Sequence, residues 1–244
     1  MTSSSPPFHV FQAPAPPPAD MPGALALFGG TFNPFHIGHL AVINALTLRP
    51  DVSGVVVIPA ACSPFKTGQT FLPASLRLAL TAAALMGRER VWVDPLEIQQ
   101  PPPSYTLHTL RAYRQRHPQA LLWWVMGSDA LEGFARWKGA EEILSLAGLL
   151  IAPRLEETGP QPEPPARWGD KLPPPWNEQA RFIEGRWQTE EGRVLAEPLQ
   201  ARPPAVSSTR LLAERRLDWV PPGAREQLAR HWAESTNPVD GGGQ

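Results

Sequence analysis

Cysteine is nearly absent from this sequence of 244 residues, in which Cys62 stands alone. One cysteine cannot form an internal disulfide or a cysteine-rich zinc site, and we expect the protein to reside in a reducing cytoplasm. An excess of one charge is also missing, because 22 Lys and Arg residues face 23 Asp and Glu residues and leave a net charge of -1. Nucleic acid is therefore not expected as a partner, whereas small phosphorylated ligands need only a local group of donors.

Long hydrophobic runs are missing as well. The apolar stretches 121–126 and 147–152 have the length of strands and fall well short of the roughly 20 residues that span a bilayer. We therefore expect neither a membrane-crossing segment nor a membrane partner. The sequence leaves open whether the chain forms a homo-oligomer.

Proline, in contrast, is abundant and marks the ends of segments. Residues 1–22 are rich in proline and lack the basic and apolar regions of a secretory signal, so we predict a disordered tail. Residues 23–235 are predicted to form one domain, followed by a second disordered tail at 236–244. Inside the domain, residues 153–193 combine prolines, charges and isolated tryptophans, which predicts an irregular insertion.

Short apolar runs alternate with helix-sized segments from Ala24 onward, the pattern of βα units in a parallel sheet. Strands are predicted at 24–28, 55–58, 91–93, 121–126 and 149–151. Helices are predicted at 38–48, 74–86, 141–146, 207–216 and 224–232, with two more that begin at Ser104 and Ser128 as N-caps.

The strongest chemical signal is Phe28-Gly29-Gly30-Thr31-Phe32-Asn33-Pro34-Phe35-His36-Ile37-Gly38-His39, between a predicted strand and a predicted helix. Adjacent glycines allow close approach of a ligand, and the start of the helix offers N–H groups and a positive dipole end to a phosphate. His36 and His39 are three residues apart and can share a helix face. The alternatives are a zinc site, for which no third ligand is evident, and a structural histidine pair.

This segment resembles the GGTFDPxHxGH signature of nicotinate mononucleotide adenylyltransferases. The letters of His36 to His39 also occur in class I aminoacyl-tRNA synthetases, but this chain is short and lacks a basic surplus. Further matches follow in the order typical of the transferases. They are Pro64-Phe65-Lys66, Pro103-Ser104-Tyr105-Thr106, Gly127-Ser128-Asp129 with Trp137, Arg154, and Val206-Ser207-Ser208-Thr209.

The resemblance implies an α/β fold, a Rossmann-like doubly wound parallel sheet with a C-terminal helical part. It implies adenylyl transfer from ATP, accompanied by Mg²⁺, to nicotinate mononucleotide, which gives nicotinate adenine dinucleotide and pyrophosphate in NAD biosynthesis. The implied catalytic residues are His36, His39 and Lys66. The implied ATP-binding residues are Gly29, Gly30, Thr31, Phe32, Gly127, Asp129, Ser207, Ser208, Thr209 and Arg210. The implied acceptor-binding residues are Ser104, Tyr105, Thr106, Trp137 and Arg154, and no metal ligand is implied.

Several positions depart from the family pattern. Asn33 replaces an aspartate, and Phe65 replaces a histidine. Ala60-Ala61 stands where relatives often have asparagine, and Leu212 replaces an arginine for which Arg210 could substitute. Two alternatives therefore stay open: a related adenylyltransferase whose acceptor is nicotinamide mononucleotide or phosphopantetheine, and a nucleotide-binding module without enzymatic activity.

Overall fold

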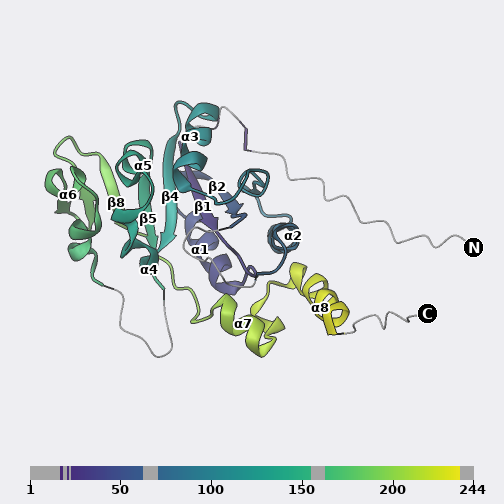
Figure 1. The fold of residues 1–244 in the computed structure, drawn as a ribbon. Coiled ribbons are helices and arrows are strands. Elements are labelled where there is room, and N and C mark those ends of the chain that lie inside the picture. Colours follow the sequence, from purple (N-terminus) through teal and green to yellow (C-terminus); the bar gives the residue numbers. More distant parts are fainter. Residues whose placement is uncertain (1–16, 19–20, 22, 63–70, 155–162, 237–244) are drawn as a thin grey trace, which may run out of the picture.

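The computed structural model describes residues 17–18, 21, 23–62, 71–154 and 163–236, which form α-helices around one eight-stranded sheet (Figure 1). The strand order is β3-β2-β1-β4-β5-β8-β7-β6. The first six strands in this order, from β3 through β8, are parallel to one another. Strands β7 and β6 extend the sheet at the β8 edge with antiparallel pairing. The strands are β1 (Ala24–Gly30), β2 (Val52–Pro59), β3 (Val91–Val93), β4 (Leu121–Gly127), β5 (Gly148–Ala152), β6 (Arg181–Ile183), β7 (Arg186–Gln188) and β8 (Val194–Pro198).

Both faces of the parallel part of the sheet are covered, which explains why its strands are apolar without interruption. Along β1, Leu25 and Leu27 belong to one core cluster, while Ala26 and Phe28 belong to another. The alternation follows from the period of two in a strand. The predicted α/β fold with a doubly wound parallel sheet is confirmed.

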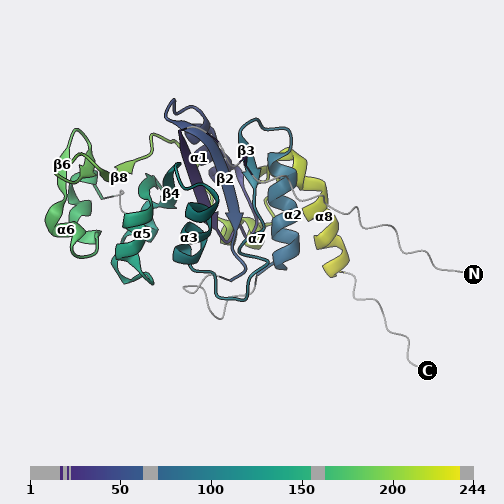
Figure 2. The same cartoon turned by 90° about the horizontal axis from the view of Figure 1, so that it is seen from above.

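The helices divide between the two faces (Figure 2). Buried residues of α3, α4 and α5 pack in the first cluster, and those of α1 and the end of α2 pack in the second. The helices are α1 (Ile37–Thr47), α2 (Ala74–Leu85), α3 (Thr106–Arg116), α4 (Ser128–Leu131), α5 (Ala140–Leu146), α6 (Trp176–Gln179), α7 (Ser208–Glu214) and α8 (Pro222–Thr236).

The C-terminal helices form the predicted helical part beside α2. Leu211 of α7 and Leu228 of α8 join Leu80 of α2 in a third, smaller apolar cluster. At Gly223 an added Cβ would lie 2.3 Å from the carbonyl oxygen of Ala83, so only glycine permits this approach of α8 to α2. None of the helices in the described part of the chain is long and apolar enough to cross a membrane.

The two predicted serine caps are wrong. Helix α3 begins at Thr106 with Tyr105 as its N-cap, and α4 begins at Ser128 with Gly127 as its N-cap, in each case without a capping hydrogen bond from a side chain. The hydroxyl of Ser104 instead accepts from the backbone N–H of Ala61 at 3.1 Å. Ser128 likewise accepts from a distant backbone group, so tertiary contacts have replaced both local caps.

The prediction of an irregular insertion at 153–193 is wrong for residues 165–188. This part contains a 3-10 helix (η2, Pro165–Lys171), α6 and the β6–β7 hairpin, which extends the sheet beyond β8. Trp168 and Leu172 are buried against the first core cluster, which provides the apolar contacts that such short elements need. Residues 155–162 and both predicted disordered tails, apart from positions 17, 18, 21 and 236, lie outside the described residues.

Candidate active site

The first wall of the site is the loop after β1. Strand β1 ends at Gly29 and Gly30, and a Cβ added at Gly29 would lie 2.3 Å from the indole of Trp124 on β4. A side chain at position 29 would therefore have to displace this indole ring. Phe32 then takes a positive φ of 45° and is buried, which turns the chain toward α1.

The two predicted histidines lie together at the start of α1. His36 is the N-cap: its Nδ1 accepts from the backbone N–H of His39 at 3.4 Å, and the Nδ1 of His39 accepts from the backbone N–H of His36 at 3.2 Å. The rings stack with centroids 3.7 Å apart. Because each Nδ1 accepts, each neutral ring carries its hydrogen on Nε2, which can donate to an anion.

His36 is held in its neutral form. Burial, together with a smaller effect of the positive charge of Arg154, lowers its pKa from 6.5 to about 4. Near neutral pH this side chain therefore acts as a hydrogen-bond donor and not as a cation.

A cavity of about 300 Å³ brings most of the predicted nucleotide-binding residues together. Its lining includes Gly29, Gly30, Thr31, Phe32, His36, His39, Gly127, Asp129, Arg154, Ser207, Ser208 and Thr209. These residues come from the ends of β1, β4 and β5 and from the starts of α1 and α7. Carboxyl ends of neighbouring parallel strands are where α/β sheets bind ligands, and β1 and β4 flank the point where the strand order reverses.

Both serines at the start of α7 make hydrogen bonds within the protein. Ser207 is the N-cap and accepts from the backbone N–H of Arg210 at 3.2 Å, while Ser208 donates to the carbonyl of Pro34 at 3.1 Å. The second contact joins α7 to the histidine loop, 174 positions earlier in the sequence. Both walls of the cavity are thereby tied to each other.

A larger cavity of about 880 Å³ adjoins the first and contains the predicted acceptor-binding residues Ser104, Tyr105, Thr106 and Trp137. The two cavities share Gly29, Gly30, Thr31, Gly127 and Asp129 as a common wall. Two ligands bound in them would therefore meet at the end of β1.

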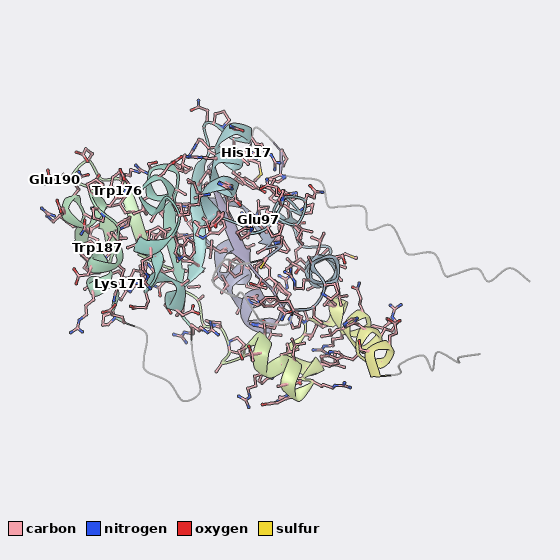
Figure 3. All side chains as sticks on the ribbon, in the orientation of Figure 1. Glu97, His117, Lys171, Trp176, Trp187 and Glu190 are labelled. Atoms are coloured by element: carbon pink, nitrogen blue, oxygen red, sulfur yellow. The ribbon has the colours of Figure 1, made fainter. Side chains whose placement is uncertain are left out.

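Glu97 is a buried carboxyl group in the larger cavity that the sequence did not reveal (Figure 3). It accepts from the hydroxyl of Thr109 at 2.6 Å and from Ser104, which itself anchors the loop after β2. Burial is the main cause that raises the pKa of Glu97. Its polar atoms thus support the Ser104 turn.

Asp129 and Arg154 form an ion pair at the boundary of the two cavities. The backbone N–H of Arg154 also donates to the hydroxyl of Ser128 at 3.3 Å, which holds the end of β5 beside α4. The pair supplies one negative and one positive group next to the common wall, and it lies close enough to His36 for Arg154 to influence that pKa.

Two predicted site residues are not brought into this arrangement. The guanidinium of Arg210 pairs with Glu214 at 2.7 Å and lies 5.2 Å from the ring centre of Trp219, and it lines neither cavity. Lys66 lies outside the described residues. The described part of the chain also contains no group of three or more His, Cys, Asp and Glu side chains that could hold a metal ion.

Arg77 is a supporting residue that sequence reasoning missed. It is 1% exposed and donates to the carbonyl oxygens of Thr31, Ala60 and Ala61 at 2.5, 2.8 and 2.9 Å, and to that of Leu72 at 3.1 Å. These carbonyls belong to loops that carry both cavities. The sequence does carry one indication that Arg77 is buried. It lies three and four residues before Leu80 and Thr81, so it shares the buried face of α2 with them.

Comparison with known proteins agrees with this site. A family model described as cytidylyltransferase-like matches residues 27–216, from β1 to just beyond α7. The chain belongs to the cytidylyltransferase-like family. The resemblance seen in the sequence is confirmed, since the relatives described next carry the name "Probable nicotinate-nucleotide adenylyltransferase".

A relative from Synechococcus sp. (strain JA-3-3Ab), named "Probable nicotinate-nucleotide adenylyltransferase", is 35% identical over 140 residues, which cover 57% of this chain and 68% of the relative. A protein of the same name from Neisseria meningitidis serogroup C is 29% identical over 85% of this chain and 96% of its own length. Five relatives, including the first, are matched over only 61% to 68% of their own length.

Among solved structures, Plasmodium falciparum nicotinic acid mononucleotide adenylyltransferase complexed with NaAD has a TM-score of 0.63 to this chain. The alignment covers 88% of this chain and 98% of the other at 13% identity. At that identity the likeness establishes that this cytidylyltransferase-like chain shares the fold.

Proposed function

We propose that this protein transfers the adenylyl group of ATP to nicotinate mononucleotide, forming nicotinate adenine dinucleotide and pyrophosphate in NAD biosynthesis. The observation that carries the proposal is the pair of adjoining cavities, one beside the histidines and one beside Ser104 to Thr106, which share the wall at Gly29 to Thr31. The names of the relatives and of the Plasmodium structure support the same reaction.

In this reaction a phosphate oxygen of the mononucleotide attacks the α-phosphorus of ATP. The new P–O bond forms as the bond from the α-phosphorus to the bridging oxygen breaks, and pyrophosphate leaves. A phosphate monoester has a second pKa of about 6, so the nucleophile is already ionised at neutral pH. The protein needs no general base, and its contribution is to position the two phosphates and to stabilise charge.

ATP is proposed to bind in the smaller cavity as its Mg²⁺ complex. In this proposal the metal enters as part of the substrate. Donors for the phosphates are the Nε2–H groups of His36 and His39 and the hydroxyl of Thr209. Lys66 is proposed to add a cation from the loop after β2.

Nicotinate mononucleotide is proposed to bind in the larger cavity. Its pyridine ring would stack on Trp137, and its carboxylate would lie against Tyr105 and Thr106 at the start of α3. The hydroxyl of Ser104 already bridges Ala61 and Glu97, so we assign Ser104 to shaping this turn. The phosphate would then extend toward the common wall, where the bound ATP presents its α-phosphorus.

The test is pyrophosphate release by the purified protein with ATP and Mg²⁺. Nicotinate mononucleotide, nicotinamide mononucleotide and phosphopantetheine are compared as acceptors in parallel, with His39→Asn as the control for a contaminating activity. We expect the highest kcat/KM with nicotinate mononucleotide. A preference for another acceptor would replace the assigned substrate, and no release with any of them would favour a nucleotide-binding module.

A further inference from the structure

We propose that Lys138 is a specificity-determining residue, whose ammonium group recognises the carboxylate of the acceptor and so selects an acidic pyridine nucleotide over its neutral amide. This inference rests on the proposed function and deepens it. Neither the family motifs nor the predicted site residues include Lys138.

The position of Lys138 is the first observation. It follows Trp137 directly, and its Nζ lies 4.4 Å from the centre of the Tyr105 ring. Lys138, Trp137 and Tyr105 all line the 880 Å³ cavity. A cation held over an aromatic face keeps its position without losing its charge. The ammonium therefore lies beside the turn where the acceptor carboxylate is proposed to bind.

The balance of charge in this cavity is the second observation. Among its carboxylates, Asp129 pairs with Arg154, and Glu132 pairs at 2.8 Å with Lys171 of η2. The third, Glu97, accepts hydrogen bonds from Thr109 and Ser104. Each acidic group therefore already has its own partners.

Lys138, in contrast, has no carboxylate within 4.0 Å among the residues that the structure describes. Arg136 is a second cation in the lining, whereas Lys138 lies over the ring of Tyr105 in the Ser104 to Thr106 turn. The charge left uncommitted beside that turn is positive. It fits a carboxylate, whereas a neutral amide gains nothing from it.

The expected effect is modest because the side chain is exposed. Exposed ion pairs are weak, and bound acceptor would remove only part of the water from this one. We expect a change of about tenfold in the ratio of kcat/KM values for the acidic and the amide acceptor, a change of the size that one well-placed charge produces.

The experiment compares wild type, Lys138→Met and Lys138→Arg with nicotinate mononucleotide and nicotinamide mononucleotide at saturating MgATP, and a separate MgATP titration gives KM for ATP. The matched control is Arg111→Met, which removes one exposed positive charge from α3, where Arg111 pairs with Glu142 away from both cavities. Lys138→Met should lower kcat/KM for nicotinate mononucleotide about tenfold and leave the value for the amide and KM for ATP unchanged. Lys138→Arg should keep the selectivity, and Arg111→Met should resemble wild type.

Two other results are distinguishable. The role of Lys138 would be overturned if Lys138→Met selected nicotinate mononucleotide as well as wild type does. It would also be overturned if kcat/KM fell equally for both acceptors. Either result would leave the proposed function standing. Wild type that prefers the amide, or uses neither acceptor, would overturn both. The binding of nicotinate mononucleotide alone, measured by calorimetry, provides a readout that does not depend on turnover.

Discussion

The imidazole rings of His36 and His39 stack at an angle of 17° and accept hydrogen bonds from each other's backbone N–H groups. Each histidine thus orients the other, and both are tied to the first turn of α1. The arrangement separates two functions within one side chain, because Nδ1 belongs to the helix cap and Nε2 is available to a phosphate. Substitution by a side chain that places a polar atom near only one of the two nitrogens can therefore separate the capping function from the binding function.

The first prediction concerns His39. His39→Asn places an amide oxygen near the position of Nδ1, so it should keep the cap but lose the donor, and turnover should fall by at least about a hundredfold. His39→Gln imitates Nε2 and should retain more turnover while losing about 1 kcal/mol of stability through the cap. Steady-state kinetics and urea unfolding measure the two effects. Near-normal turnover of the asparagine variant would remove His39 from the mechanism.

The second prediction is a pH dependence of stability caused by His36. Its pKa is about 4 in the folded protein and 6.5 when exposed, so between these values the unfolded chain binds a proton that the folded chain does not. The contribution of His36 to the free energy of unfolding should therefore have its full value above pH 6.5. It should fall by up to roughly 3 kcal/mol as the pH approaches 4. Urea titrations of wild type and His36→Gln isolate this contribution. Parallel pH profiles for the two proteins would contradict it.

The third prediction concerns the buried guanidinium of Arg77. Arg77→Met leaves four carbonyl oxygens, from the β1–α1 and β2–α2 connections, without their donor, and we expect a loss of roughly 3 kcal/mol or more in the free energy of unfolding. Arg77→Lys has three donors on one nitrogen and should recover part of the loss. Denaturant unfolding measures both.

KM gives a second measure for the same residue. Thr31 lies in the wall that the two cavities share, and Ala60 lines the larger cavity. Because Arg77 holds both residues, the Arg77→Lys protein should have raised KM values for both substrates. Arg111→Met should stay within about 0.5 kcal/mol of wild type, as an exposed substitution does. Unchanged KM values in a destabilised Arg77→Lys protein would limit Arg77 to a role in folding.

The fourth prediction concerns Trp137, which is half-buried in the larger cavity and meets Phe134 edge to face. Loss of ring stacking in Trp137→Ala should raise KM for the acceptor about tenfold, and Trp137→Phe should restore most of it. KM for ATP should not change, because Trp137 does not line the smaller cavity. A parallel rise in both KM values would indicate general damage to the site.

Most of the parallel sheet and the histidine loop could be predicted from the sequence because their signals are local. The apolar runs of β1 and β4 identify buried strands by themselves, and the segment from Gly29 to His39 lies within one strand–loop–helix unit. Strand β8 was missed because Glu197 and Pro198 interrupt an apolar run, and the structure compensates by pairing Glu197 with Arg49 at 2.6 Å.

The remaining features depend on contacts between distant parts of the chain. Ser104 resembles an N-cap in sequence, but its hydroxyl meets Ala61, 43 positions away. Arg77 resembles one polar residue in an apolar helix until Thr31 and Ala60 fold against it. The strands of the β6–β7 hairpin are three residues each, too short for a periodic signal. Such positions become recognisable only when the fold brings their partners together.

The common wall at Gly29 to Thr31, Gly127 and Asp129 has a consequence for how this protein can change over generations. In the proposed reaction, a substitution in the wall would alter the binding sites of both reactants at once, so few such changes can be beneficial. The outer part of the larger cavity, around Lys138, would contact the acceptor alone in the same reaction. New acceptors can therefore be explored there, one substitution at a time, while the chemistry that activates the nucleotide is inherited intact.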